Sequence, residues 1–324
     1  MTALFRLAVT LVLAAVPVLA QTQKAAAVSR VDGHPDLQGI WSNATITPLE
    51  RTGDKATVSD ADARALEKKA AEDLQNTDGA SDTPLLRAAG SAGTGGYNIL
   101  FIDRGSELTR VDGVKRTSLV IDPPDGKVPA MTPAGRARAF SSVAGTLTTF
   151  DNVKQRPLSE RCLLAFGSSS GPPMLPVLYN NNYQIVQTPD AVMILVEMIH
   201  DARIVRLNGQ HPSPDVKLWM GDSIGRWDGD TLVVDTTNFR DEVAFRGAGP
   251  KFHVVERFRR VDPNTMLYRA TMEDPDTWTK PWTIEYSFNA VAGQIYEYAC
   301  HEGNYAMTDI LGGARKMESG PTKK

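Results

Sequence analysis

Short apolar-rich runs separated by turn residues fill the chain from Tyr183 onward, and they constrain its fold more than any other feature. Pro189-Asp190, Asp228-Gly229-Asp230 and Asp262-Pro263-Asn264 supply turn residues between neighbouring runs. Many strands with short connections predict an antiparallel meander, and closure into a barrel removes the exposed strand edges. The predicted strands are Tyr183–Thr188, Ala191–Met198, Arg203–Leu207, Ile224–Trp227, Thr231–Thr236, His253–Val261, Met266–Glu273, Trp282–Phe288 and Gln294–Cys300.

The residue patterns of two of these runs predict different burial. Trp282–Phe288 alternates large apolar residues with polar ones, which indicates a strand with one buried and one solvated face. Ala191–Val196 is apolar at every position, so we expect it to be covered on both faces.

The first twenty residues have the pattern of a secretory signal peptide. Arg6 precedes an apolar run from Leu7 to Val16, and Val18-Leu19-Ala20 forms a small-residue cleavage site. The run is shorter than the roughly 20 residues that span a bilayer, and Pro17 interrupts it. We therefore expect a periplasmic or extracellular protein with no membrane association after cleavage.

The rest of the chain is expected to form one β-rich domain. Residues 21–35 are predicted to be a flexible leader, 36–315 the domain, and 316–324 a flexible tail. Within the domain, about 36–178 is a helical and loop part and about 179–305 is the β-meander. A helix is expected at Ser59–Gln75, where Ser59 can cap. A second, short helical turn is expected to start at Thr132-Pro133, and a third helix to start at Ser159–Cys162.

Cys162 and Cys300 are the two cysteines of the chain. In an oxidising compartment a pair of thiols predicts a disulfide, and two cysteines allow a single intramolecular pairing. The alternative is a catalytic thiol at Cys162, for which no histidine lies nearby in the sequence.

Charge and motif content limit the classes of function. A net charge of −3 gives no cationic excess to attract nucleic acid. The chain has no glycine-rich phosphate-binding motif and no zinc-ligand spacing, so we expect no cofactor and no metal, although a zinc site assembled from distant strands stays open. Gly167-Ser-Ser-Ser-Gly171 fits a nucleophile motif, but Pro172-Pro173 follows it in place of a helix, which indicates a loop.

The densest group of reactive side chains lies near the last predicted strand. His301 and Glu302 follow Cys300 and are candidates for general acid and base, with Tyr305 as a substrate contact. The alternative is a histidine at the barrel rim and a solvated glutamate, because charged side chains are mostly exposed.

A second candidate group lies in a predicted turn between two strands. His200 is a candidate base and Arg203 a candidate ligand for a carboxylate or oxyanion. The alternative is a turn stabilised by Asp201, with His200 in solvent.

Further candidates lie on the strands themselves. Asp222 and Arg226 share a strand face and are expected to form an ion pair or a ligand clamp, with Trp227 as a ring that stacks on substrate. Glu256 shares its face with apolar neighbours, so it is a candidate for a buried catalytic carboxylate. Core packing is the alternative for the tryptophans.

Two resemblances extend these expectations. Asp36–Trp41 is similar to the Gly-x-Trp signature of lipocalin-like barrels, in which the Trp closes one barrel end. This implies a lipocalin-like barrel. Together with the residue patterns above, we expect a mainly β chain whose meander closes into such a barrel, with an N-terminal helix and long loops. Segments 122–126, 179–187, 221–235 and 298–305 resemble a family of exported bacterial proteins of uncharacterised function, which implies one structural unit and no catalytic assignment.

The sequence leaves two functions open. One is a secreted, cofactor-independent lyase, isomerase or hydrolase that acts on a small organic or carbohydrate substrate by His/carboxylate chemistry at the barrel mouth. The other is a lipocalin-like protein that binds a small apolar molecule without turnover. The enzyme requires a histidine within reach of a carboxylate in an accessible site, whereas the binder requires an apolar cavity. The oligomeric state is left open.

Overall fold

The computed structural model describes residues 28–77, 102–165, 171–243 and 245–320. The predicted signal peptide and most of the Gly167–Gly171 segment lie outside the described residues.

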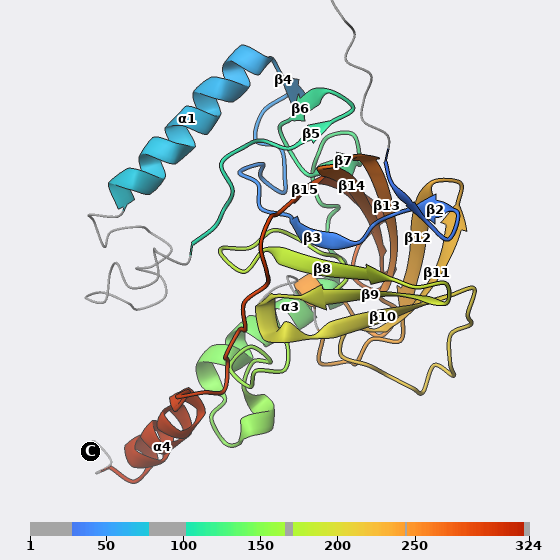
Figure 1. Cartoon of the computed structure of the whole chain (residues 1–324). Coiled ribbons are helices and arrows are strands. Elements are labelled where there is room, and N and C mark those ends of the chain that lie inside the picture. The colour runs from blue at the N-terminus through green and yellow to red at the C-terminus, as the bar shows by residue number, and fades with distance from the viewer. Residues whose placement is uncertain (1–27, 78–101, 166–170, 244, 321–324) are drawn as a thin grey trace, which may run out of the picture.

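Nine strands form a closed barrel, which confirms the predicted mainly β meander (Figure 1). The ring closes because β15 pairs with both β14 and β3. All neighbours in the ring are antiparallel except β10 and β11, whose parallel pairing sets Val205 opposite Ser223. In ring order the strands are β3 (Gly39–Ser42), β8 (Asn182–Gln187), β9 (Ala191–Val196), β10 (Ala202–Leu207), β11 (Asp222–Asp228), β12 (Thr231–Thr237), β13 (His253–Asp262), β14 (Thr265–Glu273) and β15 (Trp282–Ala290).

The parallel pair has a consequence for the outside of the barrel. A chain that leaves β10 must return to the same end of the sheet before it can begin β11. Residues 208–221 make this return, and they include His211. The sequence did not predict this crossover.

The tetrapeptide Arg-Val-Asp-Gly occurs twice and forms the same hairpin both times. β1 (Arg30–Val31) and β2 (His34–Pro35) flank one copy, and β5 (Arg110–Val111) and β6 (Val114–Arg116) flank the other. In each copy the Asp and the Gly have positive φ, as a two-residue hairpin turn requires. The Arg side chain donates to the turn carbonyl at 2.6 Å in the first copy and 2.7 Å in the second.

The N-terminal part of the chain covers the outer face of β15. β5 and β6 form a small sheet with β4 (Thr57–Val58), and β7 (Val120–Asp122) pairs with β15 directly. Thr109 Oγ1 lies 3.0 Å from Ser287 Oγ. The alternation predicted for Trp282–Phe288 is therefore correct, but the solvated face is wrong, since every residue from Trp282 to Phe288 is buried.

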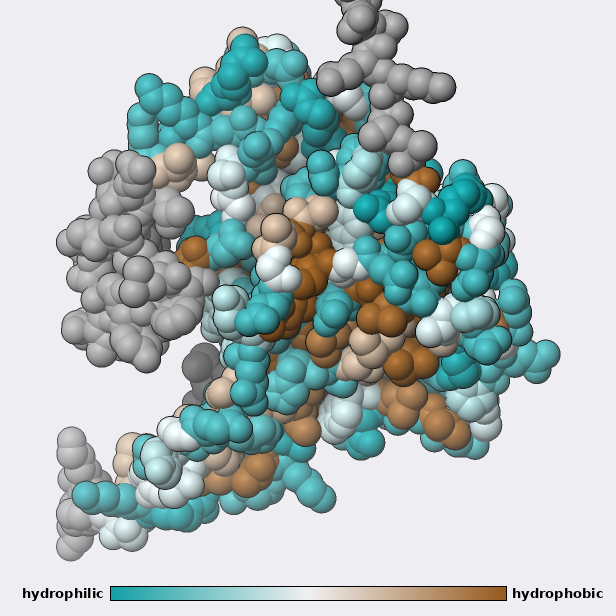
Figure 2. Space-filling model, viewed as in Figure 1, coloured by the Kyte–Doolittle hydropathy of each residue, from teal (hydrophilic) through white to brown (hydrophobic). Residues whose placement is uncertain are grey.

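The expectation that Ala191–Val196 is covered on both faces is also wrong. Val192, Ile194 and Val196 point into the barrel and are buried, whereas the alternate residues remain half-exposed. Figure 2 shows hydrophobic atoms at the surface over this region of β8 and β9, within a mostly hydrophilic exterior.

Side chains close both ends of the barrel. At one end Trp41 is 1 % exposed beneath the Arg260 guanidinium, 5.1 Å from its ring centroid, and His34 stacks on Trp227 at 4.5 Å. The Gly-x-Trp resemblance implied that Trp41 closes one end of the barrel, and its position agrees with this. At the other end the aromatic rings of Phe245, Phe252, Trp278 and Trp282 contact one another.

Two of the predicted helices form. α1 (Asp60–Thr77) begins after Ser59, whose Oγ accepts from Asp62 N at 3.1 Å. α3 (Pro133–Thr148) lies under the aromatic end of the barrel, where Gly135 packs against the Thr277 backbone. Turns replace the helix expected at Ser159–Cys162, because Cys162 adopts a left-handed φ of 52°.

The C-terminal segment differs most from expectation. Gln294–Cys300 is not a strand, because the barrel is already closed and offers no edge for another one. The chain instead runs along the outside of the barrel to α4 (Ala306–Glu318), a helix that the sequence did not predict (Figure 1). Residues expected in a flexible leader form the β1–β2 hairpin, and α4 extends into the expected tail.

Candidate functional site

Arg203 and Glu256 come together inside the barrel. The Arg203 guanidinium donates to both Glu256 oxygens, at 3.1 and 2.5 Å, and the Tyr268 hydroxyl donates to Glu256 Oε1 at 2.9 Å. The two charged side chains are 1 % and 0 % exposed. Burial acts to lower the pKa of Arg203, but the attraction of Glu256 outweighs it and the pKa is raised. The inward direction expected for Glu256 is confirmed.

This ion pair belongs to a buried polar network. Arg203 Nη2 lies 3.4 Å from Ser223 Oγ, which lies 2.9 Å from Thr236 Oγ1. Aromatic rings fill the space beside the network, with Tyr268 5.0 Å from Phe288 between centroids. A substrate has no access to these groups in the closed barrel, so we assign the network to the core.

His301, Glu302 and Tyr305 do not form a site. All three side chains are exposed, and no hydrogen bond joins the His301 ring to a carboxylate among the described residues. The predicted strand that was to carry them to the barrel mouth is absent, and they lie in the loop before α4.

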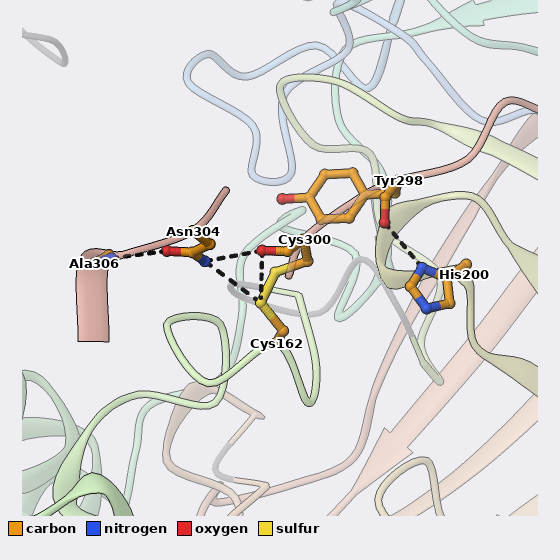
Figure 3. The surroundings of a disulfide bond; sticks show 6 residues. All are labelled: Cys162, His200, Tyr298, Cys300, Asn304 and Ala306. Carbon is orange, nitrogen blue, oxygen red and sulfur yellow. Dashed lines mark hydrogen bonds between the residues drawn. A yellow bond between two sulfur atoms is a disulfide. The ribbon is translucent and has the colours of Figure 1, made fainter. Parts of the chain in front are cut away.

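The predicted disulfide joins Cys162 to Cys300, with Cα atoms 5.9 Å apart, and is compatible with an exported protein. Figure 3 shows His200 beside this cross-link, where its Nδ1 lies 2.9 Å from the Tyr298 carbonyl oxygen. A carbonyl oxygen accepts, so His200 Nδ1 donates. His200 thus anchors the C-terminal segment to the β9–β10 connection.

The pairing expected between Asp222 and Arg226 is absent. Both face outward, but Asp222 accepts from Arg206 at 2.8 and 2.9 Å, and Arg226 is exposed near Asp228. Trp227 stacks on His34 at the barrel end, so it closes the barrel there.

Asp222 instead belongs to a hydrogen-bonded row of histidines and carboxylates on the outside of the barrel. His211 Nδ1 lies 2.7 Å from Asp222 Oδ2, and its Nε2 lies 3.0 Å from Asp235 Oδ1. The other oxygen of Asp235 lies 3.0 Å from Nε2 of His253. Asp235 therefore joins two imidazole rings, one from the crossover loop and one from β13.

The electrostatics follow from these contacts. The hydrogen bond to Asp235 raises the pKa of His253 above its ordinary value, although burial acts in the opposite direction. The same bond lowers the pKa of Asp235. Burial acts to raise the pKa of Asp222, but hydrogen bonds from Arg206 and His211 outweigh it and the pKa is lowered. The carboxylates therefore stay ionised and favour a protonated His253.

Among the described residues, His253 Nδ1 is the ring nitrogen of this histidine–carboxylate group that has no hydrogen bond. Carboxylate oxygens of Asp235 only accept, so Nε2 of His253 carries a proton. Nδ1 lies 4.0 Å from Glu273 Oε2, beyond hydrogen-bond distance, and the side chain is 35 % exposed. A carboxylate thus orients the imidazole through one nitrogen and leaves the other for proton transfer, as in general acid–base sites.

Sequence reasoning missed His211, Asp235 and His253 as a group. One signal was available, since the predicted turn at Gly229 pairs Ile224 with Asp235 and so sets Asp222 and Asp235 on one outer face. No sequence pattern predicts how the crossover loop or the β12–β13 connection folds. That His211 and His253 both approach Asp235 was therefore not predictable.

Two cavities also lie on the outside of the barrel, between it and the β5–β6 hairpin. Their volumes are about 500 and 230 Å³, and both include Asp112, Arg259 and Leu267 in their walls.

Comparison with protein-family models, with curated proteins and with solved structures finds no match to this chain. The relation to an exported bacterial family therefore remains a prediction, whereas the barrel implied by the Gly-x-Trp segment is present. Within the described ranges no group of three or more His, Cys, Asp or Glu side chains is arranged to hold a metal. No described helix is long and apolar enough to cross a bilayer.

Proposed function

We propose that this protein is an exported enzyme that uses His253 for general acid–base chemistry on a small polar substrate at the outer rim of the barrel. The observation that carries the proposal is the hydrogen bond between Asp235 and His253 Nε2, which orients a side chain that is 35 % exposed and leaves Nδ1 without a hydrogen bond among the described residues. The reaction class stays that of a cofactor-independent lyase, isomerase or hydrolase, in which a positioned imidazole moves one proton.

The neighbouring groups have distinct roles in this proposal. Asp235 is a positioning residue that fixes the ring and favours its protonated form. His211 and Asp222 hold Asp235 from the other side, and the Arg206 guanidinium neutralises Asp222. This arrangement favours His253 as a proton donor near neutral pH, because its pKa is raised.

The contents of the barrel favour the enzyme over a binder of apolar molecules. A binder of the lipocalin type holds its ligand inside the barrel, where this chain places contacting aromatic rings and the Arg203–Glu256 pair. The cavities described above lie outside the barrel and are lined by charged and polar groups.

The test combines a titration with a turnover assay. The purified protein is incubated with pooled carbohydrates and small organic acids, and product formation is measured by mass spectrometry over a range of pH. We expect His253→Gln to lower the rate by about 100-fold or more, the contribution of a positioned acid or base. Asp235→Asn should lower the rate less and shift the pH profile toward acid. Asp230→Asn is the matched control, because Asp230 is 64 % exposed in the β11–β12 turn.

NMR of the histidine rings supplies a readout that does not depend on the substrate. The pKa of His253 should lie above 6.5 in the parent protein and fall in Asp235→Asn, but not in Asp230→Asn. A rate that survives His253→Gln unchanged, or a His253 pKa at or below 6.5, contradicts the proposal.

A further inference from the structure

A row of arginines crosses the outer face of the barrel away from the His253 rim. Arg257 on β13 lies directly opposite Arg269 on β14 in the strand register, and Arg259 follows on the same face of β13. Like charges directly opposite each other destabilise a strand pair. The three side chains are 38–47 % exposed, and a carboxylate beside each one offsets part of this repulsion.

Each of these arginines has one carboxylate partner. Arg257 pairs with Asp228 at 2.7 Å, Arg259 with Asp112 at 3.3 Å, and Arg269 with Glu285 at 2.6 Å. Within the described part of the chain, Arg257 and Arg259 each donate a hydrogen bond through Nη2 alone. A guanidinium has five N–H groups, so most donors of Arg257 and Arg259 point elsewhere.

Cationic side chains exceed anionic ones at this place. Glu285 is shared, because Arg116 also approaches it at 3.7 Å. Arg226 lies close enough to Asp228 to contribute to the lowered pKa of that carboxyl, after the hydrogen bond and charge of Arg257. The local field therefore favours an anion, although the net charge of the whole chain is negative.

The arginines line a cavity of suitable size. Arg257, Arg259 and Arg269 are all in the wall of the 230 Å³ cavity. Asp112, at the tip of the β5–β6 hairpin, is also in the wall of the 500 Å³ cavity, which combines threonine, serine and asparagine side chains with charged ones. The cationic compartment thus opens beside a larger one rich in hydroxyl and amide groups.

We propose that this groove binds a small anionic carbohydrate, with its phosphate or carboxylate against Arg257 and Arg269 and its hydroxyl-bearing part in the larger cavity. Arginine favours such groups because its parallel N–H bonds match two oxygens of one anion. The site does not involve His253, which lies four residues from Arg257 along β13, roughly 13 Å away. The proposal of anion binding at the groove and the proposal of catalysis at His253 can therefore be tested independently of each other.

Calorimetric titration tests the proposal with four probes: glucose 6-phosphate, glucuronate, inorganic phosphate and glucose. We expect glucose 6-phosphate or glucuronate to bind more tightly than both inorganic phosphate and glucose, and added salt to weaken this binding. The double variant Arg257→Gln/Arg269→Gln should lose at least about tenfold in affinity, since each charge-assisted hydrogen bond contributes this much or more. Arg315→Gln is the control, because Arg315 is a 48 % exposed arginine paired with a glutamate on α4.

Thermal melting separates loss of the site from loss of the fold. The double variant relieves the repulsion between two facing arginines, but it also takes the hydrogen bonds of Arg269 from the buried Glu285 carboxylate. The rise in melting temperature that the ligand causes, and not the melting temperature without ligand, therefore reports on the site. Glucose 6-phosphate should raise the melting temperature of the parent and of Arg315→Gln but not that of the double variant. Absence of binding by both carbohydrate anions, equal binding of inorganic phosphate, or binding that the double variant retains overturns the proposal.

Discussion

Removal of one partner of the Arg203–Glu256 pair is expected to destabilise the barrel strongly. Glu256→Leu leaves the Arg203 charge in a site that is 1 % exposed and takes an acceptor from Tyr268. Loss of one partner of a buried pair costs about 3–5 kcal/mol, because the other charge stays buried without compensation. Arg203→Met should cost a similar amount for the same reason.

The double variant Arg203→Met/Glu256→Leu should be far more stable than the two single variants suggest. It removes both desolvation penalties, so we expect it to lie within about 2 kcal/mol of the parent protein. The remaining loss comes mainly from the Tyr268 hydroxyl, at about 1 kcal/mol. The double-mutant cycle therefore predicts a coupling energy of roughly 5 kcal/mol.

Urea unfolding followed by tryptophan fluorescence measures these free energies. Lys69→Met supplies the control, because Lys69 and Asp73 form a pair on α1 whose side chains are 70 % and 63 % exposed. Its effect should stay below about 0.5 kcal/mol. The reasoning is refuted if Glu256→Leu costs no more than this control, or if the double variant loses the sum of the two single losses.

Two further predictions concern the cross-link and the helices. The variant with both Cys162→Ser and Cys300→Ser should lose up to about 5 kcal/mol of unfolding free energy, since a closed loop with a sequence separation of 138 restricts the unfolded chain; an unchanged urea midpoint would contradict this. Gly135→Ala should lower the melting temperature although alanine favours helices, because its Cβ would lie 2.6 Å from the Thr277 carbonyl oxygen. At Gly312 on α4 an added Cβ meets nothing within 4 Å, so Gly312→Ala should raise the free energy of unfolding by about 0.5–1 kcal/mol. Equal effects of the two substitutions would show that the close approach at Gly135 does not matter.

The barrel was predictable from local patterns, because its strands carry their own signals. Eight of the nine strands that alternation and turn residues predicted from Tyr183 onward form, with small boundary errors, and Gln294–Cys300 does not. The β5–β6 hairpin carried the Asp112-Gly113 signal, which was available and was missed. α4 was missed because it contains Gly312-Gly313 and begins without a side-chain cap.

The candidate site was less predictable, because strand register decides which outward side chains meet. Arg203 and Glu256 were identified separately, as a turn residue and a strand residue, and only the closed ring brings them together. His211 reaches Asp235 through a crossover that no local pattern encodes. Sequence therefore indicates which side chains point inward or outward, but not which ones lie opposite across the barrel.

The pairing of β3 with β15 joins one of the first strands of the chain to the last. Two residue pairs hold this seam, Ser42 with Asn289 and Trp41 with Ala290, whereas β13 and β14 form a long ladder. Contacts between residues so distant in sequence form late, because a large loop must close before they contribute. We therefore expect the ring to close last at this seam during folding and to open there first in the native state.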